Sequence, residues 1–356
     1  MRIHSPESPR WLSLTRYPVG VSCSQAHALE HRQMGRAARL GKRTSSLKLR
    51  ISKGGFLMGG VFPASMLDKG LQDLQTSQTA ISMNCSLPDR VLFSYGMDRQ
   101  RDRLCLQSLW DFVTAKEPWI KSPFFPVLFS FTAYMAFCLP YIVLDFASIR
   151  LPNLRKYKIQ PQNYPTLGMM VPCIIQSAYH HVVLIFPVTF LHWYWRPMSL
   201  PVMAPELPEV LLEVAVCLLL FDFEYFLWHL LHHKVPWLYK TFHKVHHKHV
   251  STFALTTQYS SVWELLSLGF FAAINPVLLG CHPLTEMIFF LVNIWLSVED
   301  HSGYDLPWST HRLVPFGLYG GAPHHDLHHL KFKSNYAPYF THWDKLFGTF
   351  TESHSN

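Results

Sequence analysis

Residues 208–233 read PEVLLEVAVCLLLFDFEYFLWHLLHH, an apolar run of membrane-span length that leads directly into a cluster of histidines. About 20 apolar residues are enough for a helix to cross a bilayer. Within the cluster, His229, His232 and His233 are spaced three and four residues apart, which places side chains on one face of a helix. The stretch therefore predicts a membrane helix that presents imidazoles at its end.

Two more clusters of this kind follow, His243-Lys-Val-His246-His247 and His324-His-Asp-Leu-His-His329, and a separate His301 lies between them. Each cluster can aim two or three imidazoles at one point, as in a metal site. Zinc usually takes four ligands, so eight or more imidazoles indicate two metal ions. Imidazole binds iron, copper, zinc and nickel alike, so the ligand type leaves the metal open. Lone histidines (His192, His282 and His354) are expected to be ordinary core or surface residues.

The composition is that of a membrane protein. Charged residues make up 15% of the chain and hydrophobic residues 49%, whereas soluble domains are about one quarter charged. We expect three transmembrane helices within residues 123–228, at about 122–144, 167–193 and 208–228; the second contains the pair His180-His181. A shorter apolar stretch at 263–298 is expected to break near Asn275-Pro276 and Gly280–Pro283. It predicts a helical hairpin that crosses and returns or enters one leaflet. The predicted fold is an all-α, multipass membrane bundle.

Basic residues in short loops favour the cytoplasmic side of a membrane. The loop after the first span holds Arg155, Lys156 and Lys158, and Lys240 and Lys244 lie among the histidines. The histidine-box region, residues 229–356, is therefore expected to face the cytosol. Residues 83–122 would then be lumenal, which agrees with a glycosylation sequon at Asn84.

Residues 1–82 hold 12 Lys and Arg against 4 Asp and Glu, whereas the remainder of the chain holds 19 of each. Their composition is compatible with a transit peptide or a disordered arm, but we favour an extension of the gene model before Met83. Because the basic excess is confined to this leader, it does not indicate a nucleic-acid partner. The seven cysteines form no Cys-x-x-Cys pair. The chain also lacks a Gly-rich phosphate loop, so a nicotinamide or flavin would have to bind another protein.

Carboxylates near the clusters are candidates for orienting the imidazoles, because a metal-bound histidine commonly donates its other N–H to a carboxylate. The alternative for each of them is an interfacial charge that reaches water. Nearby aromatic residues also have two possible roles: they could line a lipid pocket, but we expect them to pack between helices. The candidate carboxylates are Asp222, Glu224, Glu299, Asp300 and Asp326, and the aromatic residues are Phe221, Phe223, Tyr225, Phe226 and Phe271.

Redox-active iron can use oxygen to attack an unactivated C–H bond, so a metal site beside apolar spans suggests a lipid oxidant. The three clusters, together with Asn293-Ile-Trp-Leu-Ser-Val-Glu-Asp-His-Ser-Gly-Tyr304 and Ala337-Pro-Tyr-Phe-Thr-His-Trp-Asp-Lys345, resemble the membrane-bound fatty acid hydroxylase and sterol desaturase superfamily. The resemblance covers about three quarters of the chain, from about 83 to 349. It departs at residues 1–82, which have no counterpart.

The resemblance implies a multipass enzyme of the endoplasmic reticulum membrane with two iron ions. It would use O2 and electrons from an NADPH-dependent reductase to hydroxylate carbon 25 of cholesterol or a related sterol in the membrane lipid. The ligands it implies are His229, His233, His243, His246, His247, His301, His325, His328 and His329, with His232 and His324 as weaker candidates.

Three other functions remain open at this point. The chain could be another oxidase of the superfamily, such as a sterol C4-methyl oxidase, a desaturase or a fatty acid hydroxylase. A metal-dependent hydrolase would contain zinc and act without oxygen, but the sequence has no His-Glu-x-x-His motif. A non-catalytic sterol-binding membrane regulator would act even without its metal ligands.

Overall fold

The computed structural model describes residue 101 and residues 104–195 and 198–352. The predictions for residues 1–82, Asn84 and His354 lie outside these residues, as does most of 83–103. The described part is helical and contains no β-strand beyond two isolated bridges. The all-α prediction is therefore confirmed for this part of the chain.

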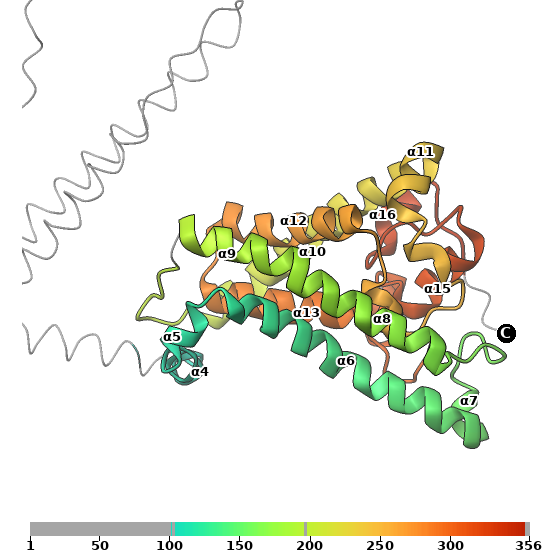
Figure 1. The fold of residues 1–356 in the computed structure, drawn as a ribbon, viewed down its shortest axis with the longest axis horizontal. Helices are drawn as coiled ribbons and strands as arrows, with labels where there is room; N and C mark the ends of the chain where they lie inside the picture. Colours follow the sequence, from blue (N-terminus) through green and yellow to red (C-terminus); the bar gives the residue numbers. More distant parts are fainter. Residues whose placement is uncertain (1–100, 102–103, 196–197, 353–356) are drawn as a thin grey trace, which may run out of the picture. The chain divides into compact units, whose positions relative to one another are not determined.

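Five long helical segments make up most of the described part. They run roughly alongside one another, and several short helices gather at one end of them (Figure 1). The long segments are α6 (Phe124–Arg150), α8 (Leu167–His180) continued by a π-helix (His181–Ile185) and α9 (Phe186–Trp195), α10 (Leu207–Lys234), α12 (Val262–Leu279) and α13 (Pro283–Asp300). The short elements are α4 (Gln107–Thr114), α5 (Glu117–Ile120), α7 (Pro152–Arg155), α11 (Pro236–Leu238), a π-helix (Tyr239–His243), α14 (Thr310–Leu313), α15 (Gly321–Lys331), α16 (Thr341–Leu346) and the 3-10 helices His246–Lys248, Ala254–Gln258 and Pro315–Gly317.

Among the described residues, three helices are long and apolar enough to cross a membrane, at Phe124–Arg150, Leu167–Trp195 and Val262–Leu279. The first two correspond to predicted spans. The third is α12, whereas α10, predicted as a span at 208–228, is not among the three. α10 carries the acidic residues Glu209, Glu213, Asp222 and Glu224 and packs against both α12 and α13. The three helices support a membrane protein, and α12 is the first half of the membrane hairpin predicted at 263–298.

The chain reverses between α12 and α13 at Gly280, which has a φ of 68°. A left-handed residue at this position is the usual way to end a helix, and glycine adopts it without strain. The second expected break, at Asn275-Pro276, is wrong because α12 runs through Pro276. The Asn275 side chain donates to Glu224 on α10 at 2.9 Å, so α12 is bonded to its neighbouring helix at the residue before this proline. Both α12 and α13 therefore have one end beside the short helices that carry the histidines.

Candidate metal centre

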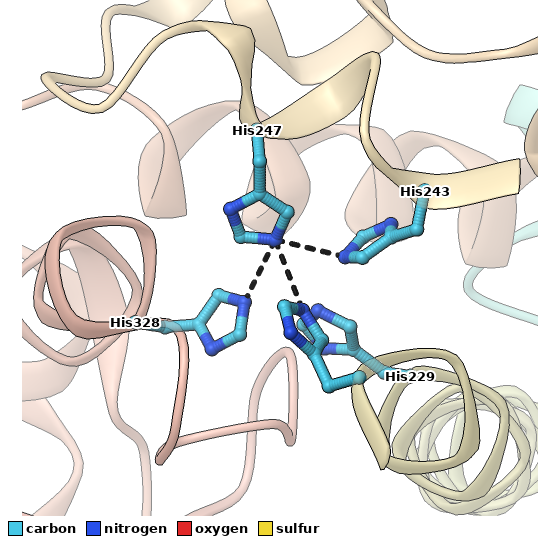
Figure 2. Close-up of side chains that lie close together, drawn as sticks. His229, His243, His247 and His328 are labelled. Carbon is cyan, nitrogen blue, oxygen red and sulfur yellow. Dashed lines mark hydrogen bonds between the residues drawn. The ribbon is translucent and has the colours of Figure 1, made fainter. Parts of the chain in front are cut away.

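Five histidines form a first group, and one ring nitrogen of each lies within 4.8 Å of the same atom of the others. The Nε2 atom of His247 is central: it lies 2.9 Å from Nε2 of His243, 3.0 Å from Nε2 of His233 and 3.1 Å from Nε2 of His328. Figure 2 shows the rings converging from α10, α15 and the segment between α10 and α12. The group consists of His229 and His233 on α10, His243 and His247 on that segment, and His328 on α15.

A second group consists of His246, His301, His325 and His329, all of them buried. Nε2 of His301 lies 3.2 Å from Nε2 of His246 and 3.0 Å from Nε2 of His325. Nε2 of His329 lies 3.2 Å from Nε2 of His325. Consecutive residues of a helix point about 100° apart. His246 and His247 therefore serve different groups, as do His329 and His328, which keeps the two groups side by side. The structure thus brings together all nine histidines predicted as ligands.

The hydrogen bonds at the other ring nitrogens determine which tautomer is present. Nδ1 of His229 lies 2.6 Å from the Tyr336 carbonyl oxygen, and Nδ1 of His328 lies 2.7 Å from that of Ser334. A carbonyl only accepts, so each Nδ1 carries the hydrogen and each Nε2 keeps a lone pair. Lone pairs that face one another at about 3 Å repel unless a cation lies between them. This arrangement fits a metal ion in each group, and such outer hydrogen bonds are typical of ligating histidines.

Burial also prepares these rings for a cation. It lowers the pKa of His243 and His246 to about 3 and that of His301 to about 4, because a charged imidazole loses its hydration in the interior. The rings are therefore neutral at pH 7. A metal ion can bind without first displacing protons from these nitrogens.

Among the residues that the structure describes, Glu264 is the one carboxylate hydrogen-bonded to a histidine of either group, and the sequence analysis missed it. Its Oε1 accepts a hydrogen bond from Nδ1 of His243 at 2.9 Å, and both side chains are fully buried. It lies in the first turn of α12, where the Ser261 side chain caps the helix by accepting from the Glu264 backbone N–H. An available signal was that Glu264 is the only acidic residue in the otherwise apolar α12, since an isolated acid in a membrane helix is usually functional.

Replacing Glu264 with alanine is expected to lower metal affinity and activity by about 10- to 100-fold, the usual cost of losing an outer hydrogen bond to a ligating histidine. Metal content per chain after dialysis against a graded chelator would measure the change. Glu264→Gln is the matched control, since its amide oxygen can still accept from His243. Equal metal retention by the alanine variant and the natural protein would contradict this role.

None of the five predicted carboxylates forms a hydrogen bond with either group, among the bonds of the described residues. Each is used elsewhere, because the folded chain brings backbone amides and hydroxyls closer to it than the rings. Asp222 accepts from the backbone N–H groups of Tyr339 and Phe340, Glu224 from Asn275, Glu299 from the Thr310 backbone, Asp300 from the Tyr319 hydroxyl and Asp326 from Gln160 and Thr252. The hydrogen bonds of the described residues therefore give these five carboxylates no direct contact with the imidazoles that they were predicted to orient. The five aromatic residues are mostly in packed contacts, such as Phe221 and Tyr225 in the core against α13.

The two weaker ligand candidates lie outside both groups. The His232 ring stacks on Trp228 with a centroid separation of 3.6 Å, and its Nδ1 lies 2.6 Å from the Trp228 carbonyl oxygen. Nε2 of His324 lies 3.2 Å from Asp344. Both face away from the groups because neighbouring residues of a helix point in different directions.

A buried turn at 334–336 holds the two carbonyl groups that orient the first group. Asn335, with a φ of 61°, lies between Ser334 and Tyr336, and its side chain bonds to the backbone of Thr351 in both directions. Asp344 accepts from the backbone N–H groups of Tyr336 and Ala337 at 2.8 and 2.9 Å. The segment around Asp344 therefore fixes the outer partners of His229 and His328.

A buried ion pair anchors the segment that carries His301. Nζ of Lys158 lies 2.8 Å from Asp145, and the Tyr304 hydroxyl donates to the same carboxylate oxygen at 2.8 Å. Gly303 has a φ of 73°, and a Cβ there would lie 2.5 Å from the Thr252 carbonyl oxygen. The Gly-Tyr of His301-Ser-Gly-Tyr304 thus has a packing role.

Comparison with known proteins places this geometry in a family. A family model described as fatty acid hydroxylase matches residues 214–349. A cholesterol 25-hydroxylase-like protein of Danio rerio is 66% identical over 68% of this chain and 97% of its own length. The cholesterol 25-hydroxylase of Homo sapiens is 60% identical over 75% of this chain and 95% of its own length. A cholesterol 25-hydroxylase-like protein of Caenorhabditis elegans is 32% identical over 71% and 84%. No solved structure matches. The chain belongs to the cholesterol 25-hydroxylase group of the fatty acid hydroxylase family.

Proposed function

We propose that this protein is a di-iron monooxygenase that hydroxylates carbon 25 of cholesterol. The observation that carries the proposal is the pair of buried imidazole groups whose Nε2 lone pairs face common points. The similarity to cholesterol 25-hydroxylases supports the choice of substrate and carbon. Atoms balance as R–H + O2 + NADPH + H⁺ giving R–OH + H2O + NADP⁺.

One iron ion would be held by the first group and the other by the second. When bound, the two ions would supply the oxygen-activating chemistry that acid and base side chains lack. The chain itself orients five of these rings through a hydrogen bond at Nδ1, as the Ser297 carbonyl oxygen does for His301 at 2.8 Å. Fully buried rings such as His328 and His329 keep bulk water from the site, which protects a reactive oxidant from side reactions.

The site is proposed to face the cytosol from the endoplasmic reticulum membrane. Exposed lysines lie beside the groups, at Lys240, Lys244 and Lys248, and basic residues favour the cytoplasmic side. The same positive face suits an acidic electron-donor reductase, because opposite charges accelerate docking.

The test is to express the protein, prepare microsomes and supply isotope-labelled cholesterol with NADPH. Mass spectrometry should find a 25-hydroxy product that carries oxygen from ¹⁸O2 and is absent without oxygen. A new double bond would indicate a desaturase, and oxidation at another carbon or of a fatty acid would indicate another oxidase of the family. Sterol modification that continues without oxygen, with zinc in the purified protein, would indicate a hydrolase.

A further inference from the structure

Two adjacent histidines, His180 and His181, lie in the middle of the span formed by α8, the π-helix and α9, and belong to neither metal-binding group. Each is 3% exposed. Polar ionisable residues inside a membrane span are costly and usually mark a functional site. The pair therefore requires a reason beyond packing.

One ring nitrogen of His181 is hydrogen-bonded and the other is not. Its Nδ1 lies 2.9 Å from the Ser177 carbonyl oxygen and must donate to it. In the neutral ring Nε2 is then a lone-pair acceptor. This Nε2 is buried and has no partner among the described residues, and the same holds for Nδ1 of His180. Buried polar atoms in native proteins are nearly always paired, so His181 requires a donor beyond those that the described residues supply.

The backbone at this point is specialised. His181 begins a π-helix of five residues, and π-helical turns within α-helices occur frequently at functional sites. The turn before it is fixed from the side, because Ser177 donates to the Gln258 side chain at 2.6 Å and Gln176 donates to the Ser260 carbonyl at 2.8 Å. The position of His181 is therefore set relative to the segment that leads into Glu264 and α12.

A series of contacts leads from the second metal group to α8, the helix that continues into His181. Sγ of Cys173 on α8 lies 4.0 Å from Nε2 of His249, and the His249 carbonyl oxygen lies 3.2 Å from Nδ1 of His329. His181 is eight residues beyond Cys173, about 12 Å further along a helix that rises 1.5 Å per residue. A sterol is about as long as one leaflet of the hydrocarbon core, roughly 15 Å. A sterol whose tail lies beside the metal groups would therefore extend along α8 in the direction of His181.

The side chains between α6 and α8 along this stretch of helix are apolar. Met170, Cys138 and Tyr134 belong to one buried cluster between α6 and α8, and the Tyr134 hydroxyl is already bonded to the Leu255 carbonyl. No polar group of these three side chains competes for a ligand. A rigid hydrocarbon skeleton with one polar end matches apolar surroundings that end at the unpaired nitrogens of His181 and His180.

We propose that His181 binds the hydroxyl group of the sterol substrate, accepting its O–H at Nε2, with His180 beside it. This inference rests on the proposed function. The hydroxyl is the donor that Nε2 lacks, and binding it at mid-span directs the opposite end of the molecule, with carbon 25, toward the histidine groups. His181 is therefore a specificity-determining residue that lies far from the carbon that reacts.

The test compares cholesterol with an analogue that lacks the 3-hydroxyl group, as substrates in the same microsomes. The natural protein should favour cholesterol in kcat/KM by about 10- to 100-fold, the effect of leaving one buried acceptor unpaired. His181→Leu should bring this ratio close to one while its iron content stays unchanged. His181→Gln, whose amide oxygen can accept, should restore part of the preference. His192→Leu is the matched control, because His192 is exposed on the same span.

A His181→Leu protein that keeps the preference of the natural protein would overturn the inference. Should that variant lose iron, the same ratio is measured in His181→Asn, whose shorter side chain does not reach the position of Nε2; a preserved preference there overturns the inference equally. Failure of the proposed function is distinct, because the natural protein itself would then form no 25-hydroxy product.

Discussion

His247→Ala is expected to lower sterol hydroxylation by at least about 100-fold and to reduce the iron content of the purified protein. Nε2 of His247 lies within 3.1 Å of the same atom in three other rings, so its loss opens the centre of the first group. Changes in outer partners of metal ligands already cost about 10- to 100-fold, and loss of a ligand should cost at least as much. Product formation and iron per chain are the two measurements.

His232→Ala is the matched control, since His232 lies near the end of α10 but outside both groups. It should retain iron and most of the activity. Loss of iron from the His232 variant equal to that from the His247 variant would contradict the placement of His232 outside both groups. A His247→Ala protein with full iron content and turnover would contradict the place of His247 at the centre of the first group.

Lys158→Met is expected to destabilise the protein by about 3 to 5 kcal/mol, because it leaves the Asp145 carboxylate buried without its cation. For a unit of this size such a loss corresponds to a fall of roughly 10 °C in the thermal unfolding midpoint. Removal of both charges, in Lys158→Met with Asp145→Asn, should recover much of the stability because no uncompensated charge remains. Thermal unfolding in detergent would measure the midpoints of the natural protein, the single variant and the double variant.

The control for this series is Lys156→Met, which removes an exposed positive charge from the same loop. Its midpoint should stay close to that of the natural protein, since exposed charges contribute little. A Lys158→Met protein as stable as the Lys156 variant would show that the buried pair does not anchor the His301 segment.

The histidines could be predicted because their evidence is local. His325, His328 and His329 fall on one face of a single helix by spacing alone, and the apolar runs around Phe131 and Ile175 are long enough to identify two spans. The partners of the histidines could not be predicted in this way. Asp222 lies seven residues before His229, which suggests the same face, but the loop at 339–340 reaches its carboxylate first.

Glu264 illustrates the opposite case. It is 21 residues from His243 in the chain, and nothing in their spacing connects them. Only the packing of α12 against α10 and the π-helical segment brings the carboxylate to the ring. The same packing carries α12 through Pro276, where sequence rules predicted a break.

By itself, the sequence determined that this protein is a helical membrane protein with a histidine-rich metal-binding region, because hydrophobic length and helical spacing act over a few turns of one segment. The tertiary structure alone decided how nine histidines divide into groups of five and four, and which oxygen atoms hold rings such as His229, His243 and His328. The physical reason is that imidazoles on segments far apart in the chain are directed by long-range packing, and a hydrogen bond forms with whichever group the fold brings within about 3 Å.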